Sequence, residues 1–240
     1  MPVSNLEKVQ NETRSLQNKK TADHIMKFFK TGKGSYSEND IFLGIKVPDL
    51  RKINKKYPLT LAETQILLRS EFHEERFLAL INLVNLYEQA DIKNKSSIVH
   101  DVYLKNTQYI NNWDLTDVSA PRITGNYFLE IDFKNKDILR YMAYSDLLFE
   151  RRIAIVSTLY FIKYNYLDFP LEISQILVRD REDLINKAVG WILRETGKKD
   201  EKRLIEFLEK NYLNLKRVTL RYAIEKFDKN TRAKFLKGVF

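Results

Sequence analysis

The scarcity of helix-breaking residues is the strongest constraint that this sequence places on its fold. Only seven glycines and five prolines occur among 240 residues, so long segments run without a backbone interruption. Apolar residues in these segments recur every three or four positions and do not alternate, as they would in strands. Typical stripes are Phe77, Leu80, Ile81 and Val84, and Ile155, Val156, Leu159 and Ile162. The pattern predicts an all-α protein.

Capping residues place several helix starts. Thr60 is followed three positions later by Glu63, which is the spacing of a capping box. Asp200 and Asp228 are expected N-caps of later helices. Pro48 suits the first turn of another helix.

Alanines near the starts of successive apolar helices indicate an internal repeat. They are separated by 41, 34, 34 and 35 residues and lie at Ala79, Ala120, Ala154, Ala188 and Ala223. Such a period is typical of one helical hairpin per repeat, and small residues at equivalent places let neighbouring helices approach closely. A chance spacing of a residue that is common in helices is the alternative. We expect stacked hairpins that form a C-shaped α-α superhelix with a concave face.

Composition excludes several kinds of chemistry. The chain has no cysteine, which rules out disulfides, thiolate catalysis and cysteine-ligated zinc. His24, His73 and His100 lie far apart without the spacing of a metal motif, so each is expected at the surface or at a helix end. We therefore expect neither a metal nor another cofactor.

Charge and hydropathy indicate the kind of partner and the cellular location. Lysine and arginine number 41 against 32 acidic residues, for a formal charge of +9, which favours a polyanionic partner. The first residues lack the apolar run of a signal peptide, and no apolar stretch reaches the length of a membrane span. We expect a cytoplasmic protein without membrane contact.

A stripe of basic residues is the first candidate for a binding surface. Lys187, Trp191 and Arg194 have the spacing of one helix face. Basic residues also open the preceding and following repeats, at Arg151, Arg152, Lys216, Arg217 and Arg221. Equivalent positions of a solenoid line up along one groove, so these charges suit successive phosphates. The alternatives are a solvated charged face, ion pairs that brace the repeats, and a core position for the indole.

The second candidate is the segment Asn111–Asp117, which holds one of only two tryptophans. Trp113 and Asp117 share a helix face at this spacing and would present an aromatic surface beside a negative charge. That pairing suits a cationic ring. Alternatively, Asp117 accepts a hydrogen bond from a neighbouring arginine.

Four segments, in this order, resemble the AlkD-like family of DNA alkylation repair proteins. They are Phe42–Arg51, Asn112–Asp117, Glu150–Ile155 and Lys187–Glu195, and the similarity runs from about residue 20 to the end. The resemblance implies one HEAT-like repeat domain over residues 1–240, with residues 1–45 as an atypical helical cap and a concave basic groove that grips duplex DNA. It further implies a glycosylase that releases cationic alkylated purines of the 3-methyladenine and 7-methylguanine type. A solenoid with both ends capped has no need to dimerise, so we expect a monomer.

Matching positions assign roles to individual residues. The resemblance implies that Trp113 and Trp191 flank the sugar of the damaged nucleotide, that Asp117 is the catalytic carboxylate and that Arg152 lies near the lesion. The expected contacts to DNA are Lys46, Arg151, Lys187, Arg194, Lys216, Arg217 and Arg221. An alkylated purine already carries the positive charge of a good leaving group. Stabilising the developing sugar cation and holding a water are then sufficient, and we expect no strand cleavage.

Two positions depart from the family pattern. Ile25 stands where active members have an aromatic residue on an early helix, and Asn112 stands where a second tryptophan precedes Trp113. Two further hypotheses therefore remain beside the glycosylase: a non-catalytic DNA-binding paralogue and a HEAT-like scaffold for acidic protein partners.

Overall fold

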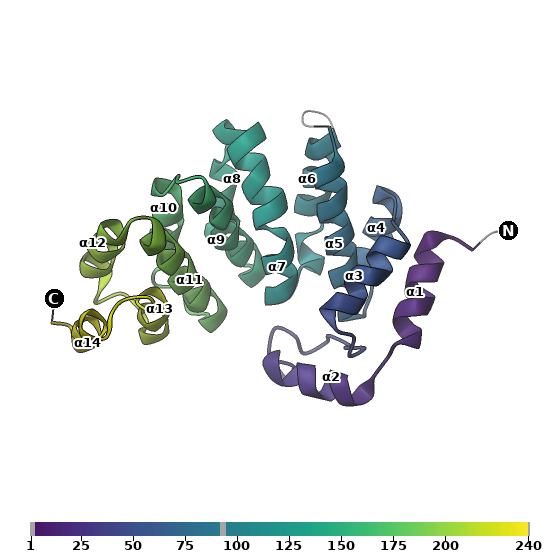
Figure 1. Cartoon of the computed structure of the whole chain (residues 1–240), viewed down its shortest axis with the longest axis horizontal. Helices are drawn as coiled ribbons and strands as arrows, with labels where there is room; N and C mark the ends of the chain where they lie inside the picture. The colour runs from purple at the N-terminus through teal and green to yellow at the C-terminus, as the bar shows by residue number, and fades with distance from the viewer. Residues whose placement is uncertain (1–2, 92–94, 240) are drawn as a thin grey trace. The chain divides into compact units, whose positions relative to one another are not determined.

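Helices make up the fold throughout the part of the chain that the structure describes (Figure 1). The computed structural model describes residues 3–91 and 95–239. Within these ranges the extended backbone forms no strand, and only an isolated bridge joins Ile41 to Phe72. The predicted all-α class is confirmed.

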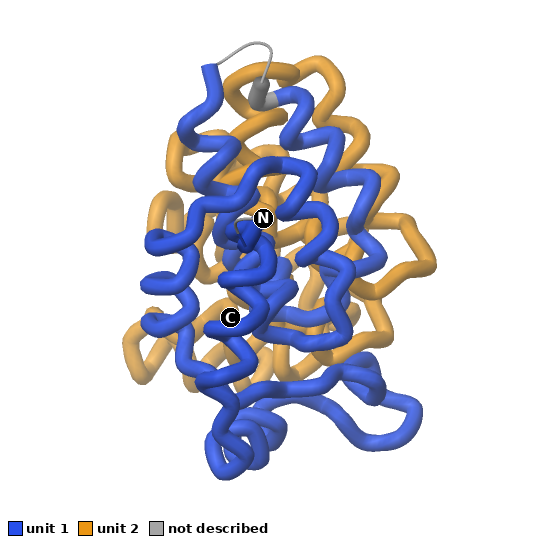
Figure 2. Tube along the Cα trace, turned by 90° about the vertical axis from the view of Figure 1, so that its right-hand side faces the viewer, with its two compact units in different colours: residues 1–119 blue, residues 120–240 orange. Residues whose placement is uncertain are grey.

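The chain divides into two compact units, residues 1–119 and 120–240, which Figure 2 shows in blue and orange. The single domain predicted for residues 1–240, with residues 1–45 as its cap, stays a prediction.

The first unit holds seven α-helices and two short 3₁₀ turns within its described residues. They are α1 (Asn5–Ser15), α2 (Lys19–Ile25), η1 (Met26–Phe28), α3 (Val47–Lys56), α4 (Leu61–Leu68), α5 (His73–Gln89), α6 (Lys95–Lys105), η2 (Thr107–Tyr109) and α7 (Trp113–Ser119). Helix α5 packs against α3, α4, α6 and α7, so its side chains form the centre of this unit.

The second unit begins with two π-helical segments and continues as helical hairpins. Its elements are η3 (Pro121–Gly125), η4 (Tyr127–Ile131), η5 (Phe133–Asn135), α8 (Asp137–Ala143), α9 (Leu148–Lys163), α10 (Asp168–Leu177), α11 (Asp183–Lys199), α12 (Glu201–Asn211), α13 (Arg217–Ala223) and α14 (Lys229–Lys237). Helix α8 packs on α9 and α10 packs on α11, while η3, α9, α11 and α13 are neighbours in that order. Successive hairpins thus stack as the repeat predicts.

The predicted helix starts agree with the structure. Thr60 and Glu63 form a reciprocal capping box at the start of α4. Asp200 and Asp228 cap α12 and α14 by accepting hydrogen bonds from backbone N–H groups. Pro48 lies in the first turn of α3.

All five alanines of the proposed repeat are buried, but not all of them lie near a helix start. Ala120 directly follows α7, and Ala223 is the last residue of α13. The reason is that α7 and α13 are only seven residues long, so a fixed place in the repeat falls at their ends.

The turn before α5 is braced by a set of hydrogen bonds. The Ser70 hydroxyl accepts the N–H of Phe72 at 3.1 Å and donates to the Glu75 carboxylate at 2.6 Å. The Arg76 guanidinium donates a hydrogen bond to the Ser70 carbonyl at 2.9 Å. These bonds satisfy polar groups that the end of one helix and the start of the next leave open.

The second unit uses the same bonds before α9. The Ser145 hydroxyl accepts the N–H of Leu147 at 3.1 Å and donates to Glu150 at 2.6 Å. Arg151 donates to the Ser145 carbonyl at 2.9 Å. Because both the residue types and the contacts recur, the repeat is present in the polar turns as well as in the helix stacking.

Neighbouring helices of the second unit approach closely at two glycines. A β-carbon on Gly125 would meet the Ser157 carbonyl oxygen at 2.3 Å, and one on Gly190 would meet the Thr219 carbonyl oxygen at 2.6 Å. Both obstacles are backbone atoms, which cannot rotate away. Packing of α9 on η3 and of α13 on α11 therefore requires glycine at these positions.

Replacing Gly190 should destabilise the second unit. We expect Gly190→Ala to lower the free energy of unfolding by about 1–3 kcal/mol, because the added methyl group forces α11 and α13 apart. Thermal unfolding followed by circular dichroism measures the change. Gly32→Ala is the matched control, since a β-carbon on Gly32 meets nothing within 4 Å. Equal melting temperatures for the two variants would contradict the packing argument.

Candidate active site

Trp113 and Asp117 lie one turn apart on α7 and line the same pocket in the first unit. The pocket has a volume of about 750 Å³, which is enough for a drug-sized ligand. Both side chains are partly exposed. The predicted arrangement of an aromatic surface beside a carboxylate on one helix face is therefore present.

The pocket is mostly apolar with a few charged groups. Elements α2, η1, α3, α5 and α7, with the segment before α3, supply its walls. Its charged residues are Lys46, Glu74, Asp114 and Asp117, and His73 also lines it. Two acidic side chains of α7 thus face an apolar space, in which charges interact more strongly than in water.

Stacked rings hold the Trp113 indole in place. The Phe29 ring lies 5.2 Å from the indole, centroid to centroid, at an interplanar angle of 18°. Phe29 in turn contacts the Phe42 ring at 4.9 Å. Both phenylalanines are buried, so one face of the indole rests on a fixed apolar support.

An aromatic residue on the early helical segment is also present, although not at Ile25. Ile25 packs as an aliphatic side chain at the edge of the Phe29 and Phe42 cluster. Phe28, three positions later, lines the pocket with 66% of its surface exposed. The sequence indicates this position, because residues three apart in a helix share a face, and Phe28 is three residues after Ile25.

Asn112 is an internal anchor. It is fully buried, and its amide donates to the Ser37 hydroxyl at 2.7 Å and to the Asp40 carboxylate at 3.0 Å. Its amide oxygen accepts the backbone N–H of Trp113 at 2.8 Å. Asn112, which stands in place of the tryptophan of the family pattern, therefore fixes the start of α7 through hydrogen bonds.

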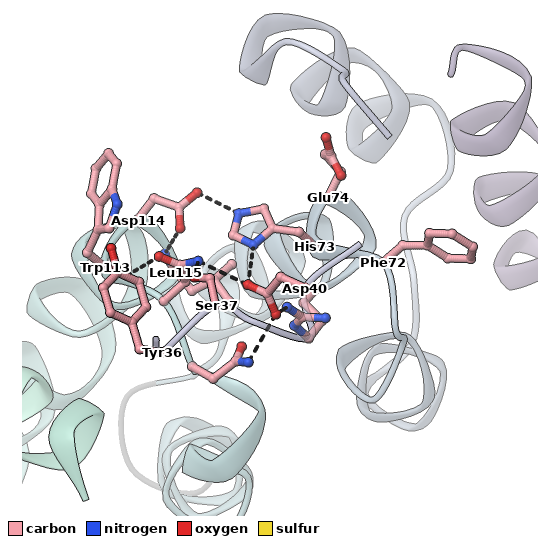
Figure 3. A network of polar contacts seen from close by, with 12 residues as sticks. Tyr36, Ser37, Asp40, Phe72, His73, Glu74, Trp113, Asp114 and Leu115 are labelled. Carbon is pink, nitrogen blue, oxygen red and sulfur yellow. Dashed lines mark hydrogen bonds and ion pairs between the residues drawn. The ribbon is translucent and has the colours of Figure 1, made fainter. Parts of the chain in front are cut away.

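His73 is a buried residue at the centre of an ion network that the sequence does not reveal. Its Nε2 lies 2.8 Å from Asp114 and its Nδ1 lies 3.4 Å from Asp40, as Figure 3 shows. Arg76 pairs with the other oxygen of Asp40 at 2.6 Å. A histidine at a helix start resembles a surface residue in sequence, because both of its carboxylate partners are remote along the chain.

The expectation for the three histidines is wrong in part. His24 is exposed near the end of α2, and His73 is the first residue of α5. His100, however, is buried inside α6. It lies beside the buried Val99 and one turn before the buried Tyr103, on the inward face of the helix.

The network shifts the pKa values of its members. Burial lowers the pKa of His73, but the charge and hydrogen bond of Asp114, with the nearby Asp40 carboxylate, outweigh burial and raise it to about 9. Burial raises the pKa of Asp40, but the contact with His73, the charge of Arg76 and the hydrogen bond from Asn112 hold it below its usual range. His73 is therefore an imidazolium at neutral pH.

Glu74 fixes the backbone beside the pocket. Its buried carboxylate accepts the N–H groups of Leu43, Gly44 and Ile45 at 2.8, 2.7 and 3.3 Å. Gly44 has a φ of 80°, and a β-carbon there would meet the Asn18 carbonyl oxygen at 2.2 Å. The Glu74 carboxylate and the glycine at position 44 thus hold the segment that leads into Lys46 and α3.

Trp191, in the second unit, lies on a partly exposed face of α11 with Lys187 and Arg194. Lys187 pairs with Asp183 at 2.7 Å. Arg194 pairs with Glu195 at 3.2 Å and also with Glu225. The predicted face is present, but acidic neighbours offset its cations.

Arg151 and Arg152 have structural contacts at the start of α9. Arg151 pairs with Asp180 at 2.7 Å in addition to its bonds within the turn. Arg152 is only 5% exposed and donates to the Leu184 carbonyl at 2.8 Å. These bonds join α9 to the turn between α10 and α11 and to the first turn of α11, and a contact of either residue with DNA stays a prediction.

The remaining predicted DNA contacts are exposed. They are Lys46, Lys216, Arg217 and Arg221. Arg217 donates to the Leu236 carbonyl at 2.7 Å. Exposed cations can approach a phosphate without first losing a buried partner, so this group is better suited to DNA than Arg151 or Arg152.

Two features are absent from residues 3–91 and 95–239. No helix there is both long and apolar enough to cross a membrane. No group of three or more histidine, aspartate or glutamate side chains in these ranges is arranged to hold a metal ion.

Stability should fall at alkaline pH because of His73. A pKa raised from 6.5 to about 9 on folding contributes stability that is complete below about pH 6.5 and is lost as the pH rises through about 9. We expect the free energy of unfolding to decrease by a few kcal/mol over this range. Urea unfolding at a series of pH values measures it, and His73→Gln should flatten the curve. An equally steep decline in His73→Gln would assign the loss to other groups.

Comparisons with known proteins give a family match and a structural match. The family model described as DNA alkylation repair enzyme matches residues 9–227. A solved structure described as "Predicted DNA alkylation repair enzyme from Enterococcus faecalis" superposes with a TM-score of 0.69 at 15% sequence identity, covering 89% of this chain and 97% of that one. No curated protein matches the chain.

The solved structure shares the fold, which is the predicted HEAT-like arrangement of helices. The family match spans most of the sequence, including both tryptophans and Asp117, and it confirms the resemblance. The chain therefore belongs to the family of DNA alkylation repair enzymes.

Proposed function

We propose that this protein is a DNA glycosylase that hydrolyses the N-glycosidic bond of cationic alkylated purines in duplex DNA. Membership of the repair family supplies the general role. The observation that carries the finer proposal is the placement of Trp113 and Asp117 side by side at an apolar pocket. Lesions of the 3-methyladenine and 7-methylguanine type carry the positive charge that this pair complements.

The reaction needs little acid catalysis. An N3- or N7-alkylated purine leaves as a neutral base, taking the electron pair of the glycosidic bond, and a water molecule adds to C1′ of the sugar. Asp117 stabilises the oxocarbenium character at C1′ and accepts the proton of the attacking water. The Trp113 indole contributes cation–π attraction of about 0.5–2 kcal/mol to the same cation.

The pocket residues fit a monofunctional hydrolase. The chemistry as written uses water, a carboxylate and aromatic faces, and it requires no cofactor. Phe28 supplies an exposed aromatic surface beside Ile25, which supports engagement of a flat lesion. We expect an abasic site as the product and no strand cleavage.

The second unit contributes residues by analogy with the family. We assign the partly exposed Trp191 indole to the sugar of the damaged nucleotide and Arg152 to the vicinity of the lesion. Arg152 already donates to a backbone carbonyl, so its contribution is a fixed positive charge. Lys46, Lys216, Arg217 and Arg221, with Arg151, Lys187 and Arg194, are the proposed contacts to DNA.

Asp117→Asn should lose base excision while it retains DNA binding. The amide has the shape of the carboxylate but no charge, and we expect the single-turnover rate to fall by about 10²–10³-fold. The assay measures free base released from a duplex that contains N7-methylguanine, with enzyme in excess. Asp101→Asn is the control, because Asp101 is exposed on α6 and does not line the pocket. Absence of released base with the wild-type protein would contradict the proposed glycosylase activity.

DNA binding should depend steeply on salt and on the exposed cations at the N-cap of α13 and within it. Each lost phosphate contact reduces the slope of log K against log salt by about 0.9, so Lys216→Ala/Arg221→Ala should reduce it by about 2. Fluorescence anisotropy with a labelled duplex at several salt concentrations measures the slope. Lys202→Ala removes an exposed cation of α12 and should leave it unchanged.

The binding and excision assays together separate the three hypotheses. Salt-dependent duplex binding without released base would identify a non-catalytic paralogue. Absence of duplex binding at moderate salt would favour a scaffold for acidic protein partners.

A further inference from the structure

The proposed reaction does not use His73, although this residue lines the same pocket as Asp117. Its ring is almost fully buried, at 3% exposure. One ring nitrogen faces Asp114 at 2.8 Å and the other faces Asp40 at 3.4 Å (Figure 3). The contact with Asp114 is a hydrogen bond, whereas the contact with Asp40 is an ion-pair distance that leaves Nδ1 without a hydrogen-bond partner. A neutral imidazole has only one N–H, so only the doubly protonated ring is attracted to both carboxylates.

A polar path leads from His73 to the backbone of Trp113. Asp40, which faces the imidazole, also accepts the Asn112 amide at 3.0 Å. Asn112 in turn accepts the N–H of Trp113 at 2.8 Å. On the other side of the ring, Asp114 is the next residue after Trp113 and accepts the N–H of Leu115 at 2.9 Å. The first turn of α7 is thus held on both sides of the indole.

An apolar path leads from His73 to the indole itself. The imidazole stacks on the Phe42 ring with centroids 4.6 Å apart at 25°, and it contacts the Phe29 ring at 5.2 Å. Phe29 is the ring on which Trp113 stacks. A movement of the imidazole therefore reaches Trp113 through its backbone and through its aromatic support.

The charges around His73 favour its protonated form. Asp40, from the segment before α3, and Asp114, from α7, contact the ring, and Arg76 on α5 lies behind Asp40. The other charged pocket residues are Glu74 on α5, Asp117 on α7 and Lys46 at the start of α3. Acidic groups outnumber basic groups in this set.

We propose that His73 is a positioning residue: its imidazolium clamps Asp40 to Asp114 and so fixes the Trp113 indole beside Asp117. The effect on excision rests on the proposed glycosylase function, whereas the effect on Trp113 does not. Loss of the proton leaves a nitrogen lone pair against a carboxylate oxygen. The clamp then opens on one side, and the indole loses its fixed orientation.

Tryptophan fluorescence tests the clamp without reference to activity. Trp191→Phe leaves Trp113 as the sole indole, and a red-edge excitation excludes tyrosine. We expect the emission to titrate with a midpoint near pH 9, the value to which the pKa of His73 is raised. In Trp191→Phe/His73→Gln, this step should disappear, because glutamine keeps a donor for Asp114 but cannot titrate.

Two results would overturn the clamp. One is a Trp191→Phe emission that does not change between neutral pH and pH values well above 9. The other is the same step in the double variant, which would assign it to a different group. If the glutamine variant fails to fold, the titration of Trp191→Phe alone still decides the first point, and His73→Asn replaces glutamine for the second.

Base excision tests the consequence for catalysis. With Trp191 intact, His73→Gln should lower the single-turnover rate by about ten- to a hundredfold while the Kd for duplex DNA stays within about twofold. The wild-type rate should also fall on the alkaline side, through the same midpoint, and the variant should lack this limb. An unchanged rate and pH profile in His73→Gln would contradict the catalytic role. A fluorescence step without excision by any variant would retain the clamp and refute the glycosylase.

Discussion

The first unit depends on the compensation of buried charge at the start of α5. His73, Glu74, Glu75 and Arg76 are consecutive and all buried, and such groups are costly to remove from water unless each finds a partner. His73 and Arg76 pair with Asp40, Glu74 binds three backbone N–H groups, and Glu75 pairs with Arg14. The helix that forms the centre of the unit therefore fixes α1, the segment before α3 and the start of α7 together.

The contacts that compensate these buried charges also set the geometry of the pocket. The backbone around Gly44 follows the Glu74 carboxylate, and that backbone forms one wall of the pocket. The start of α7 follows Asp40 through Asn112. A surface helix could present Trp113 and Asp117 at the same spacing, but it would not hold them against an apolar space. Pre-organisation of this kind is what electrostatic stabilisation of a developing cation requires.

Much of the fold could be predicted from local patterns, whereas the bracing of the site could not. The capping box at Thr60 and the shared face of Trp113 and Asp117 depend on residues a few positions apart, so spacing alone reveals them. His73 depends on Asp114, which lies 41 residues away, and helical periodicity carries no information about such pairs. Arg151 and Arg152 show the same limit: sequence spacing places them in a basic stripe, and only the structure shows that they also brace hairpins.

If a charged histidine holds the start of α7, both ring nitrogens of His73 must carry a proton in the folded protein. Long-range ¹H–¹⁵N correlation spectra of histidine-labelled protein, with His73→Gln to assign the signals, report both ring nitrogens. Both nitrogens should carry a proton at neutral pH, and the signals should titrate near pH 9. A single neutral tautomer of His73 at neutral pH would contradict the clamp.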